Sequence, residues 1–130
     1  MEKLNILEIE ERLTHLVDWE YYDDALHTDF EFDNFKDCMS AMNRIAFECE
    51  ALNHHPEWTN IYNTLQITLT THDAGGVTDL DFQLATIINK IVEVEETTII
   101  IEVEGQNRLK IEKSAISAEN TAVAYPAVKK

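Results

Sequence analysis

The sequence is short of basic side chains, with 10 lysines and arginines against 25 aspartates and glutamates, so its formal net charge is −15. A surface this acidic repels phosphate groups, which argues against direct binding to nucleic acids or anionic membranes. No apolar run approaches the roughly 20 residues of a membrane span, and Met1–Glu11 is too acidic for a signal peptide. We therefore expect a cytoplasmic protein whose ligands are small molecules or other proteins.

Glycine, proline and cysteine are also scarce, at 3, 2 and 2 residues. The chain contains no glycine-rich phosphate loop, no CxxC pair and no internal repeat. Cys38 and Cys49 fall in one expected helix, where roughly 16 Å would separate them, beyond the limit of about 7 Å for a disulfide. We expect two free thiols buried as small apolar side chains, which fits a reducing compartment.

The length of 130 residues and the hydrophobic content of 45% suit one globular domain with its own core. Charge is unevenly spread, because residues 1–93 hold 19 acids and 5 bases whereas residues 94–130 hold 6 acids and 5 bases. We place a boundary at this change, with a domain over 1–95 and an extension over 96–130. Alternation over Thr97–Glu104 and Arg108–Lys113 predicts a β-hairpin in the extension, followed by a flexible tail.

Hydrophobic periodicity within the first 95 residues predicts an α+β fold, in the order α-β-β-α-β-β-α. Its four antiparallel strands should form a sheet with helices packed on one face. The expected elements are a helix over 6–17, a hairpin over 19–32, a helix over 34–52, strands over 58–62 and 64–72, and a helix over 78–93. The last strand should project Leu65, Ile67 and Leu69 to one face and end at His72 on the polar face.

The helix over 34–52 has the clearest local signals. Asn34 is a good N-cap residue, Asp37 stands at the capping-box position, and Pro56 favours an end at Asn53. Its spacing predicts one apolar seam of Phe35, Met39, Met42, Ala46 and Cys49, broadened by Ile45 and Leu52. An apolar face this wide can cover the sheet and also bind a partner helix.

Several polar and aromatic side chains are candidates for a functional site: Glu50, His54, His55, Trp58, Tyr62, His72 and Asp81. Taken singly, each has a structural explanation, since a histidine can cap a helix and Asp81 can serve a capping box after Thr78. Trp58 and Tyr62 can be core aromatics. Three histidines and an aspartate are also a possible metal-ligand set. The adjacent His54 and His55 diverge in an extended chain, however, so we expect no metal.

Taken together, the order and spacing of these residues resemble the signature of the pterin-4a-carbinolamine dehydratases. That signature is an acidic residue, three residues, His-His-Pro, an aromatic five or six residues on, a histidine nine further, and then an aspartate. The chain supplies Glu50, His54-His55-Pro56, Tyr62, His72 and Asp81 in this register. The resemblance covers about residues 6–93 and leaves the extension out.

The resemblance implies a hydro-lyase that removes water from 4a-hydroxytetrahydrobiopterin, or a related pterin, and yields the quinonoid dihydropterin for tetrahydropterin recycling. It implies no cofactor and no metal. His54 and His72 become the expected acid and base, in either order. His55 would hold the pterin and assist, and Asp81 would orient an imidazole. Imidazole suits both proton transfers near neutral pH.

Four substrate contacts follow from the same resemblance. Glu50 and His55 are expected to bind the pterin, and Trp19 and Trp58 are expected to lie beside its ring. Ala74 and Leu80 depart from some animal members, which carry a cysteine and an arginine there. Neither position belongs to the signature, so we expect catalysis without that arginine.

The family also leaves other functions open. Its animal members dimerise a homeodomain transcription factor through helix faces, and some bacterial relatives are associated with molybdopterin metabolism. A helix-mediated protein-binding module with a vestigial pocket is therefore the alternative to an enzyme. Family members form dimers that extend the sheet and tetramers joined by helices, so we expect a homodimer or homotetramer.

Overall fold

The computed structural model describes the backbone of residues 1–105 and the side chains of residues 1–94. Its elements are α1 (Ile6–Leu13), β1 (Glu20–Tyr22), β2 (Ala25–Glu31), α2 (Phe35–Leu52), β3 (Glu57–Ile61), β4 (Thr64–Leu69), the 3-10 helix η1 (His72–Ala74) and α3 (Asp79–Gly105). The predicted α+β order is thus confirmed, with η1 as an additional element between β4 and α3. Met1–Ile91 form one compact unit.

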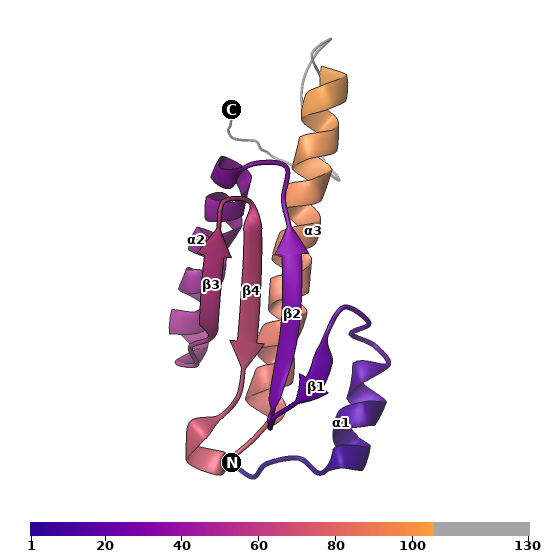
Figure 1. Cartoon of the computed structure of the whole chain (residues 1–130), viewed down its shortest axis with the longest axis vertical. Helices are drawn as coiled ribbons and strands as arrows, with labels where there is room; N and C mark the ends of the chain where they lie inside the picture. The colour runs from indigo at the N-terminus through magenta and orange to yellow at the C-terminus, as the bar shows by residue number, and fades with distance from the viewer. Residues whose placement is uncertain (106–130) are drawn as a thin grey trace. The chain divides into compact units, whose positions relative to one another are not determined.

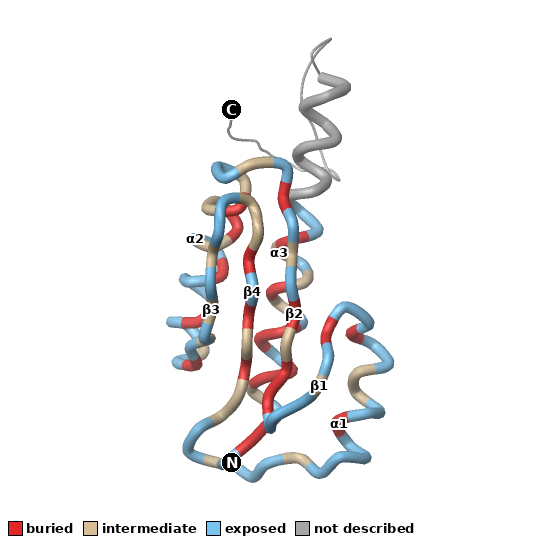
Figure 2. Tube along the Cα trace, viewed as in Figure 1, coloured by how far each residue is buried: buried red, intermediate tan, exposed pale blue. Residues whose placement is uncertain are grey.

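The sheet has the strand order β1-β2-β4-β3, and each neighbouring pair is antiparallel. Helices α2 and α3 lie on the same face of this sheet, as Figure 1 shows. Leu65, Ile67 and Leu69 of the central strand β4 are at most 1% exposed. They project toward the helices, as the alternation predicts, and β4 alternates between buried and less buried residues (Figure 2).

The β1–β2 hairpin turns at Asp23 and Asp24, which both have positive φ values, 52° and 59°. A two-residue turn with two left-handed residues matches the right-handed twist of the strands it joins. Aspartate tolerates this conformation better than most residues do. The two strands and their turn lie within the hairpin expected over residues 19–32.

Helix α2 begins and ends where its local signals predict. The Asn34 side chain accepts a hydrogen bond of 2.8 Å from the Asp37 amide. At the other end, Asn53 adopts the left-handed conformation, with φ at 52°.

The buried face of α2 includes Ile45 and Cys49, as predicted, but it is rotated by about a quarter turn from the rest of the predicted seam. The buried residues are Cys38, Ala41, Ile45 and Cys49, whereas Phe35, Met39, Met42 and Ala46 are exposed or half-buried. The buried face is richer in small side chains, which allow the helix backbone to approach the sheet closely. Both cysteines on it are free thiols, as expected. Burial raises the pKa of Cys49 to about 11.

Helix α1 is attached to the start of α3 by Arg12. Its guanidinium donates to Asp79 over 2.6 Å and lies 5.5 Å from the centroid of the Phe82 ring. Hydrogen bonds from Arg12 and then from Gln83 lower the pKa of the Asp79 carboxyl below its ordinary value of 3.8. A backbone hydrogen bond of 2.8 Å from the Leu4 amide to the Val77 carbonyl further ties the N-terminal segment to this region.

The expected strand over Thr97–Glu104 is wrong, because α3 continues as a helix to Gly105. The stretch between Asp79 and Glu104 contains no glycine or proline, so nothing in it interrupts the backbone ladder. Helical context therefore overrides the β-branched composition of residues 97–101. The second expected strand, Arg108–Lys113, and the expected flexible tail lie outside the described residues. The domain boundary near residue 95 stays a prediction.

Candidate active site

His54 is placed by the way α2 ends. Asn53 turns the chain out of the helix in the left-handed conformation, and the His54 amide then donates to the Cys49 carbonyl over 3.0 Å. Pro56 holds the following segment extended before β3 begins. The turn directs the His54 side chain inward, so that the residue is 8% exposed.

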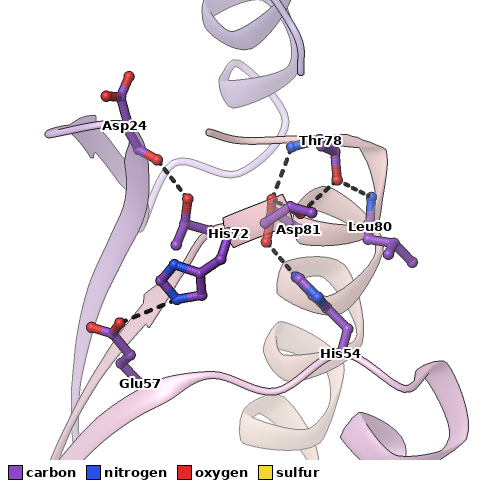
Figure 3. Close-up of polar contacts among 9 residues, drawn as sticks. Asp24, His54, Glu57, His72, Thr78, Leu80 and Asp81 are labelled. Carbon is purple, nitrogen blue, oxygen red and sulfur yellow. Dashed lines mark hydrogen bonds and ion pairs between the residues drawn. The ribbon is translucent and has the colours of Figure 1, made fainter. Parts of the chain in front are cut away.

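Asp81 receives that side chain from the first turn of α3. Its Oδ1 lies 2.5 Å from Nε2 of His54, and the residue is fully buried. Its Oδ2 accepts two further hydrogen bonds of 2.8 Å, from the Thr71 hydroxyl and the Thr78 amide. Figure 3 shows Asp81 between the His54 ring and Thr78. A buried carboxylate is costly unless hydrogen-bonded, and here all three groups that surround Asp81 donate to it.

The two threonines extend this network in one direction. Because the Thr71 hydroxyl donates to Asp81, its oxygen accepts from the Thr78 hydroxyl at 2.7 Å. The Thr78 oxygen in turn accepts from the Leu80 amide at 3.3 Å. Asp81 thus supplies the carboxylate half of the expected capping box of α3, while the Thr78 side chain caps the Leu80 amide, and Asp81 serves the cap and His54 together.

The hydrogen bond to Asp81 assigns the proton of neutral His54 to Nε2, because a carboxylate only accepts. Nδ1 is then the nitrogen that can gain or lose a proton. With 8% exposure, however, His54 offers a substrate little surface. The hydrogen bond between His54 and Asp81 mainly fixes the orientation of the imidazole and of the segment between α2 and β3 that carries it.

Two exposed histidines lie near this buried pair in the fold. Nε2 of His55 is 2.7 Å from Oε1 of Glu50, which lies in the last turn of α2, and both side chains are more than half exposed. Nε2 of His72 is 3.5 Å from Oε2 of Glu57, the first residue of β3. Since Glu57 follows His55 by two residues, both imidazoles flank the start of β3. Either ring can meet a ligand from solvent.

The sequence predicts that His72 ends a strand, and this is wrong. Strand β4 stops at Leu69, and His72 is the first residue of η1. The cause is the tight loop that follows. The Thr71 amide donates to the Gly76 carbonyl over 2.9 Å, and Gly75 adopts a φ of 80°, where a side chain would be strained. The loop closes on itself and presents the His72 ring at the edge of the sheet.

A cavity of about 450 Å³ opens beside His72. Its walls come from the β1–β2 turn, the ends of β2, β3 and β4, and the Gly75–Gly76 loop. The lining residues are Asp23, Asp24, Ala25, His27, Glu57, Thr68, Thr70, His72, Gly75 and Gly76. Of the residues predicted for the site, this cavity includes His72 alone.

The two tryptophans do not join the histidines. Trp19 is 4% exposed, its Nε1 donates to Asn89 of α3 over 2.9 Å, and its ring meets Phe30 edge to face. It is a core residue in this structure, and its expected place beside a substrate ring stays a prediction. Trp58 is half-buried and pairs in register with Ile67, which places it on the face of the sheet that the helices cover. Tyr62 is 63% exposed at the β3–β4 turn.

Sequence reasoning misses Thr71 and Glu57. Thr71 lies between two elements and has no local signal, and its bond to Asp81 depends on how the η1 loop closes. Glu57 could have been found, because its place two residues after His55 at the start of a strand brings it to the edge that His72 reaches.

Two further classes of site are not found in the described part of the chain. Among the side chains of residues 1–94, no group of three or more His, Cys, Asp and Glu residues could hold a metal ion. None of the described helices is sufficiently long and apolar to cross a membrane.

Comparison with known proteins places the chain among dehydratases. Residues 2–91 match the family described as Pterin 4 alpha carbinolamine dehydratase. A protein of Christiangramia forsetii, provisionally named a pterin-4-alpha-carbinolamine dehydratase, is 50% identical over 93 residues, which are 72% of this chain and 96% of that protein. A protein of Chelativorans sp. with the same provisional name is 48% identical, over 68% of this chain and 92% of its own.

A solved structure resembles the fold as well. The crystal structure of a transcriptional coactivator/pterin dehydratase from Brucella melitensis superposes with a TM-score of 0.68 at 38% sequence identity. The match covers 69% of this chain and 98% of the Brucella chain.

Proposed function

The chain belongs to the pterin 4 alpha carbinolamine dehydratase family, and on that premise we propose that it removes water from a 4a-hydroxytetrahydropterin such as 4a-hydroxytetrahydrobiopterin. The observation that carries this proposal is the buried His54–Asp81 pair, set below two exposed imidazoles. The reaction needs an acid and a base near neutral pH, and imidazole can serve as either.

The chemistry divides between two proton transfers. The C4a–O bond breaks as the oxygen receives a proton, so that water leaves in place of hydroxide. The adjacent ring N5 loses its proton, and the electron pair forms the C4a=N5 double bond of the quinonoid dihydropterin. The reaction is an elimination without oxidation or reduction, and the only other product is water.

We assign the two transfers to the exposed histidines, His55 and His72. Each has a carboxylate partner, Glu50 or Glu57, which can orient its ring. This exchanges the roles that the resemblance implies for His54 and His55. The reason is access, because the His55 side chain is 57% exposed whereas that of His54 is 10% exposed. His54 and Asp81 act as positioning residues.

The experiment is to generate the 4a-hydroxytetrahydropterin in solution and follow its ultraviolet decay with each protein. His55→Ala and His72→Ala should each lower the acceleration by about 10²-fold or more, the usual contribution of a positioned acid or base. His54→Gln should lower thermal stability while retaining more of the rate than either. Folded wild-type protein that gives no acceleration would contradict the dehydratase proposal. A larger loss in folded His54→Gln than in His55→Ala would contradict the assignment of roles.

A second candidate, protein binding through α2, has one observation in its favour. Phe47 is 76% exposed and Phe35 is 49% exposed on the sides of α2 that face away from the sheet. Exposed aromatics of this kind are typical of protein interfaces. We propose that they join subunits in a homodimer or homotetramer. Light scattering on wild type and Phe47→Glu tests this, and an unchanged mass for the variant would contradict it.

A further inference from the structure

The loop that carries His72 is closed by backbone hydrogen bonds between Thr71 and Gly76. The Thr71 amide donates to the Gly76 carbonyl over 2.9 Å, and the Thr71 carbonyl accepts from the Ala74 and Gly75 amides over 3.0 and 3.1 Å. His72 is the first residue inside this closed loop. Because these bonds leave the loop little internal freedom, the contacts that hold the loop as a whole also determine where the His72 ring lies.

The two ends of the loop are attached to α3 at a single atom. The Thr71 hydroxyl and the Thr78 amide both donate to Oδ2 of Asp81, each over 2.8 Å. Two attachments that converge on one atom act as a pivot, since they fix a point and leave rotation about it. A loop held only in this way could swing and carry His72 with it. A further contact away from Asp81 is needed to stop that motion.

The N-terminal segment, which comprises residues 1–5, supplies a contact of this kind. The Leu4 amide donates to the Val77 carbonyl over 2.8 Å, and Val77 is 1% exposed. The aliphatic stem of Lys3 covers Gly76, where a β-carbon would lie 3.1 Å from Cδ of Lys3. Gly76 is buried beneath it. Figure 1 shows the N-terminus beside the connection between η1 and α3. The segment therefore supports the loop at a point that Asp81 does not reach.

Helix α1 holds the N-terminal segment in place. The Asn5 side chain accepts from the Glu8 amide over 2.9 Å, and the Asn5 amide donates to Oε1 of Glu8 over 3.0 Å. This capping box fixes the direction in which the chain enters the helix. Arg12 then joins the helix to Asp79 over 2.6 Å. Since Ile9 is the one buried residue of α1, the helix adds little to the core, and its contacts mainly fix residues 1–5 relative to α3.

Given the proposed function, we infer that the N-terminal segment is a positioning element for catalysis, which supports the η1 loop through Leu4 and Lys3 and so holds His72 in place for proton transfer. The segment itself touches no reacting atom. Its effect is on geometry, and a displacement of about 1 Å at a reacting group can lower a rate by up to about 10²-fold. Loss of the Leu4 bond leaves the attachment at Asp81 intact and frees the loop to rotate about it.

The variant Leu4→Pro removes the amide donor and keeps an apolar side chain at this position. NMR order parameters of the His72, Asp73 and Gly75 amides should fall from about 0.85, the value of rigid backbone, to about 0.6 or below. In the ultraviolet decay assay, kcat should fall by about tenfold while KM stays within about twofold. The loss falls on kcat because His72 is needed in the transition state, whereas the rest of the site still binds the substrate.

Two control variants separate positioning from general damage. Glu2→Pro places the same residue two positions earlier, and Glu2 donates no backbone hydrogen bond to the loop in the described part of the chain. Ile45→Ala removes buried volume from α2 and lowers the stability of the whole domain. Both controls should keep the loop order parameters of wild type and a kcat within about twofold of it. Equal losses in Leu4→Pro and in either folded control would contradict a specific role for Leu4.

A deletion provides a second test that does not depend on proline. A chain in which Met1 is followed directly by Asn5 lacks both the Leu4 bond and the Lys3 cover. It should remain folded by circular dichroism and show losses at least as large as those of Leu4→Pro. Unchanged order parameters in the folded deletion variant would overturn the inference, and so would a loosened loop with unchanged kcat.

These outcomes are distinct from failure of the proposed function. Wild-type protein that gives no acceleration would overturn the proposed reaction. A loosened loop in Leu4→Pro would then still support the N-terminal segment as the element that holds His72, because the order parameters are measured without turnover. Acceleration by wild type that persists in full in both Leu4→Pro and the deletion variant would leave the dehydratase proposal standing and overturn the positioning role.

Discussion

At the residue scale, the first turn of α3 carries two aspartates with opposite environments. Asp81 is fully buried and accepts hydrogen bonds from His54, Thr71 and Thr78. The Asp79 side chain is 52% exposed and meets Arg12. The same substitution at the two positions therefore separates the contribution of a buried network from that of a surface ion pair.

Asp81→Asn should lower the free energy of unfolding by about 1–3 kcal/mol, because an amide offers one acceptor atom and places donors against at least one existing donor. Urea unfolding at pH 7 measures the loss. Asp79→Asn is the matched control and should cost less than about 1 kcal/mol. A cost for Asp81→Asn no greater than that of its control would show that the buried network contributes nothing beyond a surface pair.

The contribution of Asp79 to the free energy of unfolding depends on pH. Arg12 and Gln83 lower the pKa of the Asp79 carboxyl, so the folded state binds this proton less readily than the unfolded state does. The stabilisation is present above the ordinary pKa of 3.8 and is lost as the pH falls through the lowered value. The free energies of unfolding of wild type and Asp79→Asn should differ at pH 6 and converge as the pH falls below 3.8 and through the lowered pKa. A constant difference across this range would assign the effect to something other than ionisation.

At the element scale, local signals predicted more than packing signals did. The alternation of β4 and the terminal residues Asn34 and Asn53 of α2 depend on neighbouring positions, and each is confirmed. The buried face of α2 depends on fit against the sheet. Phe35 and Met42 are more hydrophobic than Ala41. The hydrophobic pattern alone therefore predicted burial of the face that carries Phe35 and Met42, whereas the face that carries Ala41 is the buried one.

Contacts between segments that are far apart in the sequence could not be predicted from local patterns either. Trp19 meets Asn89 across 70 positions, and no local pattern indicates that its indole is used in the core. His72 left the expected strand because the Gly75 turn closes a loop behind it. The resemblance brought His54 and Asp81 into one site, and it could not reveal Thr71, whose contact depends on that loop.

Paired truncations on α2 test which face supports the fold. Ile45 is fully buried, so Ile45→Ala should lower the free energy of unfolding by about 2–5 kcal/mol. Met42 is half-buried, and Met42→Ala should cost less than about 1.5 kcal/mol in the monomer. Chemical denaturation at low protein concentration measures both. The reverse order of costs would favour the seam first predicted from the sequence.

At the scale of the whole molecule, the histidines, their carboxylate partners and the cavity all belong to the compact unit Met1–Ile91. Arg12 and the Leu4 amide tie the N-terminal segment to the start of α3 within the same unit. The described contacts of the site thus need nothing from the rest of the chain.

A chain that stops after Val94 should therefore fold and keep its proposed dehydratase activity within about twofold, a change of about 0.4 kcal/mol in the barrier. Circular dichroism and the ultraviolet decay assay measure the two properties. A truncated chain that folds and loses more than tenfold in rate would show that residues beyond Val94 contribute to the site. Loss of folding would show that they contribute to stability.

The register partners Glu20, His27, Thr68 and Glu57 form a polar row across the uncovered face of the sheet, and this row depends on the alignment of the strands during folding. Each strand gives this row one member, and a slip of one residue in any strand would turn its member toward the core. A misregistered sheet could still collapse around its apolar side chains, but it could not assemble the row. The hydrogen bond between His27 and Thr68 would thus form only when the two central strands, β2 and β4, are correctly aligned.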